Sequence, residues 1–141
     1  MRWHEFLDTA GRLARGSTEG DWRSAVSRGY YGVFHFFREF LLTNGVDIGQ
    51  SGTSHSNLYV GLNNCGIGVV ALIADRINDL RKTRTWADYD LRRFVDQQEA
   101  LGAARDSGKL VADFQALLPT TPAAQIAVGA KRYLKSIGRI P

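Results

Sequence analysis

The chain has 141 residues, a formal net charge of +4 at pH 7, and 44% hydrophobic and 23% charged residues, as in an ordinary globular protein of one domain. No apolar run approaches the roughly 20 residues that a membrane-spanning helix needs, and the single cysteine, Cys65, excludes an intramolecular disulfide and a cysteine-based zinc site. The mild positive charge is compatible with binding to nucleic acid but does not require it.

The first segment, MRWHEFLDTAGRL, predicts an amphipathic helix that ends near Gly16. Its acidic residues stand where a signal peptide keeps its apolar core, so we expect a mature N-terminus and a cytoplasmic protein. The next stretch, STEGD, is a turn with three candidate N-caps, which are Ser17, Thr18 and Asp21. A long second helix is expected to run to about Thr43 and to end at Asn44–Gly45.

After a polar loop, HSNLYVGLNN predicts a short third helix capped by Ser54 or Ser56, followed by Cys65, which is expected to be a small buried residue. A fourth helix is predicted from about Val69 to Thr83, and TRTWADYD is interpreted as a break. Asp88 or Asp90 is expected to cap a fifth helix, whose apolar face is predicted to contain Phe94, Leu101, Ala104, Val111, Phe114 and Leu118. Pro122 suits the first turn of a sixth helix, from about Ala123 to Ile137.

Helical periodicity throughout, with short connections, predicts an all-α fold: an antiparallel helical bundle of about five to six helices. We expect residues 1–118 to form the bundle and residues 119–141 to be a C-terminal helical extension that packs on the same domain. The second helix, RSAVSRGYYGVFHFFREF, is apolar on nearly all sides, which is typical of a central or interface helix. Gly29 and Gly32 each cost about 1 kcal/mol in a helix interior, so close approach of another helix is expected there.

Two polar groups interrupt this apolar helix. Arg28 and His35 are seven residues apart, which places them on one stripe about 10 Å apart along the axis, with Tyr31 between them. One interpretation is structural: Arg28 pairs with a carboxylate such as Asp75, Asp79 or Asp88, and His35 is a core histidine bonded to a carbonyl. The other is functional: the pair lines a groove, where the arginine holds a phosphate and the histidine moves a proton.

A second group of candidates combines His55 with the basic run Arg81, Lys82 and Arg84. Cations near a helix end are favoured by the helix dipole, which is the structural interpretation. In the functional interpretation Arg81 and Arg84 hold a phosphate, with Asp88 orienting one of them. The rings of Trp86 and Tyr89 either pack in the core or stack on a nucleobase. The spacing of the histidines and carboxylates predicts no metal site, and no cofactor-binding motif is present.

These segments resemble proteins of the HEPN domain family, the small helical bundles of prokaryotic toxin–antitoxin and defence systems. RSAVSRGYYGVFHFFREFLL is similar to the second helix of such proteins, LRKTRTWADYD to the stretch after their fourth helix, and SHSNLY to a short helix that opens with a histidine. The resemblance covers roughly Trp3 to Leu118. Arg28 and His35 enclose GYYGVF, a separation that fits the arginine–histidine motif of the ribonuclease members.

The resemblance implies a homodimer with a cleft where two copies meet, and metal-independent cleavage of RNA in that cleft. His35 would assist attack of a 2′-hydroxyl on the adjacent phosphate, and Arg28 would stabilise the charged transition state. The residues expected to contact phosphate or RNA are Arg81, Arg84, His55, Tyr31, Asp88 and Tyr89. The implied partners are RNA or a nucleotide and a nucleotidyltransferase-type antitoxin. The alternative is a non-catalytic module that binds nucleotides or proteins and acts with such a nucleotidyltransferase.

Overall fold

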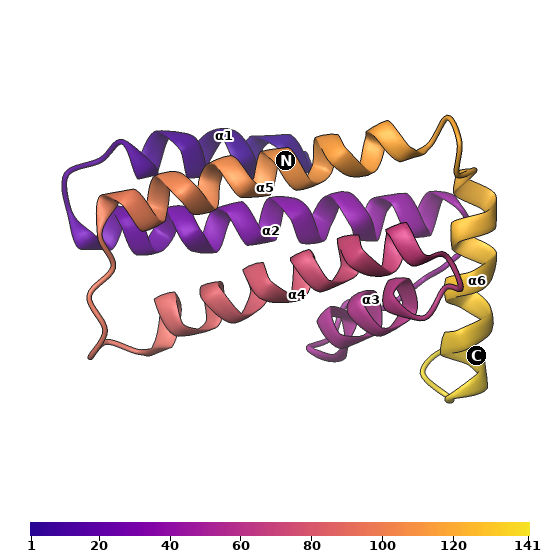
Figure 1. Ribbon diagram of the computed structural model, residues 1–141. Coiled ribbons are helices and arrows are strands. Elements are labelled where there is room, and N and C mark those ends of the chain that lie inside the picture. The colour runs from indigo at the N-terminus through magenta and orange to yellow at the C-terminus, as the bar shows by residue number, and fades with distance from the viewer.

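The computed structural model describes residues 1–141, and six α-helices with no strands confirm the all-α prediction. The helices are α1 (Trp3–Ala14), α2 (Glu19–Thr43), α3 (Thr53–Asn63), α4 (Gly68–Tyr89), α5 (Gln97–Leu117) and α6 (Ala123–Ser136). Helices α1, α2, α4 and α5 lie side by side, and α6 crosses one end of the bundle (Figure 1). None of the helices combines the length and the apolar character that crossing a membrane requires.

Helix α2 is the centre of the bundle and packs against α1, α4 and α5. Trp3 near the start of α1 contacts Phe36 late in α2, so these two helices are antiparallel. Arg23 near the start of α2 donates a hydrogen bond to the carbonyl oxygen of Ala87 near the end of α4, so α4 is antiparallel to α2 as well. Helix α5 instead runs in the same direction as α2, as Figure 1 shows.

Two of the three glycines of α2, Gly29 and Gly32, lie against neighbouring helices, as the sequence predicted. A β-carbon on Gly29 would lie 2.7 Å from the hydroxyl oxygen of Ser107 on α5. A β-carbon on Gly32 would lie 2.5 Å from a methyl carbon of Leu7 on α1. Glycine at both positions lowers the helix propensity of α2, but it allows α5 and α1 to pack closely on two sides of the helix.

The ends of α2 also follow the sequence. Of the three candidate caps, Thr18 is the N-cap, and its hydroxyl accepts a hydrogen bond from the backbone N–H of Asp21 at 3.1 Å. At the other end Asn44 is the C-cap residue, and Gly45 follows with a φ of 86°, which few other residues adopt.

The predicted break at TRTWADYD is wrong, because α4 continues without interruption to Tyr89. The hydroxyls of Thr83 and Thr85 donate hydrogen bonds to the carbonyl oxygens of the residues four positions earlier, at 3.0 and 2.9 Å. These bonds satisfy the threonines within the helix. Ala87 is buried against Val26 of α2, so this last part of α4 is held by tertiary packing.

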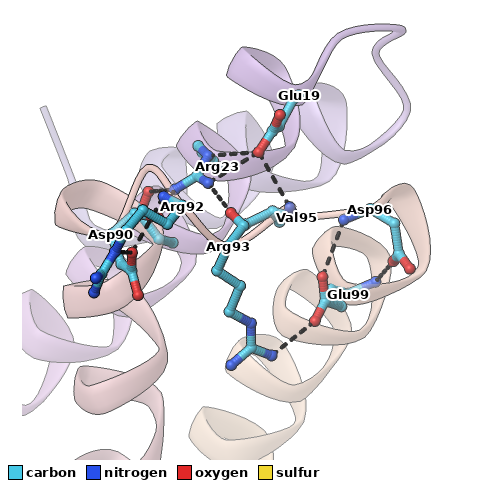
Figure 2. Close-up of polar contacts among 9 residues, drawn as sticks. Glu19, Arg23, Asp90, Arg92, Arg93, Val95, Asp96 and Glu99 are labelled. Atoms are coloured by element: carbon cyan, nitrogen blue, oxygen red, sulfur yellow. Dashed lines mark hydrogen bonds and ion pairs between the residues drawn. The ribbon is translucent and has the colours of Figure 1, made fainter.

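The connection between α4 and α5 is tied to α2 by Arg23, whose side chain is only 13% exposed. Its guanidinium donates hydrogen bonds to the carbonyl oxygens of Ala87, at 2.7 Å, and of Asp90 and Arg93 (Figure 2). Glu19 accepts from Arg23 at 2.9 Å and from the backbone N–H of Val95 at 3.2 Å. A partly buried ion pair thus fixes the path of the connecting segment.

The predicted caps of α5 and α3 are wrong. Neither Asp88 nor Asp90 caps α5; Asp96 does, in a reciprocal capping box with Glu99 that Figure 2 shows. Because α5 begins later than predicted, Phe94 lies outside it and is 63% exposed rather than part of its apolar face. Helix α3 begins after Gly52, and neither Ser54 nor Ser56 is its N-cap.

Helix α6 buries four residues in the main hydrophobic core, which are Ile126, Ala127, Ala130 and Leu134. It packs chiefly on α3, and Arg139 just beyond it donates hydrogen bonds to Ser56 and Asn57 of that helix. Cys65 is buried and free. Residues 119–141 therefore pack on the bundle, while a domain boundary at residue 118 stays a prediction.

Candidate functional site

Arg28 and His35 both lie beside the ring of Phe6, at the seam between α1 and α2. The Arg28 guanidinium carbon is 5.9 Å from the centre of that ring, and the imidazole centre of His35 is 4.9 Å from it. Arg28 is exposed and His35 is half-buried. The two groups share one stripe of α2, about 10 Å apart along the helix axis.

The structural interpretation of this pair is wrong. The carboxylate of Asp88 pairs with Arg84 at 3.0 Å, and that of Asp75 accepts hydrogen bonds from Tyr59 and Asn63. Arg28 has no carboxylate within ion-pair distance, and no carbonyl accepts a hydrogen bond from His35. Neither side chain has a hydrogen-bond partner within the chain.

His35 and Arg38 form the boundary between two surface hollows. One, of about 440 Å³, is lined on its other side by Trp3, Phe6 and Leu42. The second, of about 330 Å³, is named the His35 hollow here, and its other lining residues are Tyr31, Phe34, Gln50, Ser51, Gly52, Ser54 and His55. A small anionic group in the His35 hollow would meet two imidazoles and one guanidinium.

Arg38 is the functional candidate that the sequence analysis missed. Its Nε donates a hydrogen bond to the carbonyl oxygen of Gly49 at 3.1 Å, which orients the guanidinium and leaves its terminal nitrogens free. Burial, with the charge of Arg38 adding to it, lowers the pKa of His35. His35 is therefore a neutral imidazole at neutral pH. The signal was present in the sequence, because Arg38 follows His35 by three residues and so lies on the same side of the helix.

His55 is held by Tyr30 and Phe34 of α2. The Tyr30 hydroxyl lies 2.6 Å from Nδ1 of His55, and the imidazole stacks on Phe34 with ring centres 4.1 Å apart. Burial raises the pKa of Tyr30, so its hydroxyl stays protonated and donates to Nδ1, which places the imidazole proton on Nε2. Burial and the nearby cations Arg81 and Arg84 lower the pKa of His55 to about 4. His55 is thus a neutral N–H donor in the hollow.

Arg84 connects α4 to this hollow. Its Nε donates to the carboxylate of Asp88 at 3.0 Å, and its terminal nitrogen donates to the Tyr31 hydroxyl at 2.9 Å. The hydroxyl of Ser27 also donates to Asp88, at 3.2 Å. Asp88 therefore orients Arg84, the arrangement that the functional interpretation of this pair required.

Arg81 and Lys82 line a different and larger depression on the C-terminal half of α4. This depression, named the α4 groove here, has a volume of about 860 Å³ and is lined by Asn78, Arg81, Lys82, Thr85, Trp86, Tyr89, Asp90, Leu91 and Arg92. The interpretation in which Tyr89 packs in the core is wrong, because the residue is 72% exposed. Trp86 is half-buried, with the guanidinium of Arg93 3.6 Å from its ring centre.

The structure thus brings most of the predicted site residues together, but not all of them. His35, His55 and Tyr31 line the His35 hollow, and Arg84 with Asp88 adjoins it. Arg81 and Tyr89 lie in the α4 groove, and Arg28 lies apart at Phe6. No group of three or more histidine, cysteine, aspartate or glutamate side chains is arranged to hold a metal ion.

Fold and site together define a small all-α protein of six helices, with a surface hollow between α2 and the start of α3 that is lined by two histidines and Arg38. No protein-family model matches the chain, and no significant match exists among curated proteins or solved structures.

Proposed function

We propose that the protein binds RNA at the His35 hollow and cleaves it without a metal ion. The observation that carries this proposal is the state of His35: a half-exposed imidazole with a lowered pKa and no hydrogen bond, at the edge of a surface hollow beside Arg38. A neutral imidazole beside a fixed cation is suited to removing a proton next to a bound phosphate. The resemblance to HEPN ribonucleases points to the same histidine.

In the proposed reaction, His35 accepts the proton of a ribose 2′-hydroxyl, and the 2′-oxygen attacks the adjacent phosphorus. The phosphorus–5′-oxygen bond breaks, a 2′,3′-cyclic phosphate forms, and the leaving 5′-oxygen takes a proton from water. Arg38 is the cation nearest to His35 and would stabilise the charge that builds on the phosphate. The Nε2–H of His55 would donate a hydrogen bond to a phosphate oxygen.

Arg28 enters this scheme through a second copy of the chain. Within one copy it is about 10 Å from His35 along the helix axis, and it lines neither hollow. A homodimer in which two α2 helices pack antiparallel across the Phe6 seam would bring Arg28 of one copy toward His35 of the other. A homodimer and a nucleotidyltransferase-type antitoxin as a further partner are both part of the proposal and rest on the HEPN resemblance.

The test is cleavage of a mixed RNA, with and without a metal chelator, by the unchanged protein and by three variants. His35→Ala is expected to lower the rate about 10²–10⁴-fold, the usual contribution of a general base, and Arg38→Ala and Arg28→Ala should lower it as well. Arg105→Ala on α5 is the matched control, since Arg105 is exposed and lines neither hollow.

Cleavage that survives the chelator and depends on His35 supports the enzyme. Cleavage that the chelator abolishes, or that persists in folded His35→Ala, contradicts it. No cleavage by the unchanged protein, together with loss of the dimer in Arg28→Ala, would favour the non-catalytic interaction module instead.

A further inference from the structure

We propose that the α4 groove is an extended binding track for single-stranded RNA: nucleotides next to those in the His35 hollow lie along α4, with a base stacked on Tyr89. This inference deepens the proposed function and rests on it. It assigns a role to the largest depression of the surface, which the cleavage chemistry does not use.

The charges of the groove favour an anionic ligand. Three cations line it, Arg81, Lys82 and Arg92, against one carboxylate, Asp90. Asp90 pairs with Arg92 at 3.4 Å, and that arginine side chain is 94% exposed. Arg81 and Lys82 have no carboxylate within ion-pair distance, so their charges are available to phosphates.

The aromatic residues of the groove favour a nucleotide over a simple anion. The Tyr89 ring is exposed, and the guanidinium of Arg84 lies 5.8 Å from its centre. An exposed ring beside cations is the arrangement on which single-stranded nucleic acids stack their bases, largely without sequence preference. Leu91, which is 79% exposed, lines the groove next to Tyr89 and adds an apolar edge for a base.

The wall of the groove is tied to α2 by hydrogen bonds. Asp90 and the residues that follow it are held by the Arg23 hydrogen bonds to Ala87, Asp90 and Arg93, shown in Figure 2. Arg93 in turn packs on the ring of Trp86. A preformed surface of this kind avoids the entropy cost of ordering a segment on binding.

Arg84 lies between the groove and the His35 hollow. Its guanidinium lies 5.1 Å from the ring centre of Tyr31, which lines the hollow, and 5.8 Å from that of Tyr89, which lines the groove. From Arg81 to Tyr89 the groove extends about 12 Å along the helix. One extended strand could therefore pass from His35 over Arg84 into the groove.

The test measures binding of two uncleavable 2′-deoxy ligands, a dinucleotide and a single-stranded oligomer of about eight nucleotides. We expect Tyr89→Ala to weaken binding of the longer ligand about tenfold, the effect of losing one stacked base, and to leave the dinucleotide unchanged. Lys82→Ala should reduce the salt dependence of the binding constant for the longer ligand by the amount that corresponds to about one phosphate contact. Lys131→Ala on α6 is the control, since Lys131 is exposed and lines no groove.

A longer oligomer carrying 4-thio-2′-deoxyuridine, photo-crosslinked and mapped by mass spectrometry, should attach to residues of the α4 groove. Crosslinks elsewhere, or equal binding of the longer ligand by the unchanged protein and both variants, would overturn the inference. The inference would also be overturned, in favour of a protein partner, if an acidic peptide displaced the oligomer and bound equally well to the unchanged protein and to Tyr89→Ala. If the groove variants have no effect while His35→Ala abolishes cleavage, only this inference fails; if His35→Ala leaves cleavage unchanged, the proposed function fails.

Discussion

The Tyr30 hydroxyl on α2 and Nδ1 of His55 on α3 are 2.6 Å apart, and their hydrogen bond joins the central helix to the short helix that borders the hollow. Tyr30 is 1% exposed, so the hydroxyl has no access to water in place of this bond. The bond orients the imidazole of His55. Burial and the charges of Arg81 and Arg84, rather than this contact, favour its neutral state.

The first prediction concerns stability against acid. Burial and the charges of Arg81 and Arg84 place the pKa of His55 at about 4 in the folded state, below its ordinary value of 6.5. The unfolded chain therefore binds the proton first, and stability falls as the pH drops from about 6.5 to about 4 and then levels off. Because His55 is half-exposed, we expect a loss on the order of 1 kcal/mol after solvent screening.

His55→Asn is the variant that tests this, since an asparagine oxygen can still accept from Tyr30 but has no proton to bind in this range. Urea midpoints measured at several pH values should fall less steeply for the variant than for the unchanged protein. Parallel slopes in the two proteins would mean that His55 is not the group responsible.

The second prediction concerns the charge state of His35. Burial lowers its pKa, and Arg38 lowers it further. Removing the cation in Arg38→Ala should therefore raise the pKa toward the ordinary value, as followed by the imidazole proton signals in an NMR titration. If His35 is the general base, the acid limb of the cleavage profile should move to higher pH by the same amount. An unchanged titration would show that Arg38 does not act on His35.

The third prediction concerns the α4–α5 connection. Arg23→Ala removes a charged donor from three backbone carbonyls, those of Ala87, Asp90 and Arg93. Because hydrogen bonds to charged groups contribute about 1.5–3 kcal/mol each and water can replace part of this loss, we expect a destabilisation of about 2–3 kcal/mol in urea unfolding. Hydrogen exchange should also accelerate in residues 90–96. Arg105→Ala, at an exposed arginine of α5, should change the stability by less than about 0.5 kcal/mol.

Much of the fold could be predicted because its signals are local. The cap at Thr18, the stop at Asn44–Gly45 and the close approaches at Gly29 and Gly32 all follow from residue types at fixed spacings. The cap of α5 is also a local signal, since DQQE at positions 96–99 has the spacing of a capping box. The prediction placed the cap at Asp88 or Asp90 instead, because aspartate at those positions is a cap-forming residue type as well.

The continuation of α4 through TRTWADYD could not be read in this way. It depends on contacts with a distant segment: Ala87 packs on Val26, and Arg23 binds the carbonyls at the helix end. The same holds for the site. Spacing placed Arg28 and His35 on one stripe, but only the fold shows that His55, twenty residues beyond His35, completes the hollow and that Arg84 adjoins it.

The fourth prediction concerns two glycines in the middle of helices. A β-carbon on Gly129 of α6 would lie 2.9 Å from the carbonyl carbon of Cys65 and closer still to its oxygen. These are backbone atoms, so α6 would have to move away from the α3–α4 connection, and four core residues of α6 would lose packing. We expect Gly129→Ala to destabilise the protein by about 2–3 kcal/mol, despite the better helix propensity of alanine.

Gly108 on α5 is the matched control, because a β-carbon there meets no atom within 4 Å. Gly108→Ala should stabilise the protein by up to about 1 kcal/mol, the propensity difference alone. Opposite shifts of the urea midpoints are thus expected for the same chemical change. Stabilisation by both substitutions would instead mean that α6 packs less closely on Cys65 than described, and the core contribution of residues 119–141 would be correspondingly smaller.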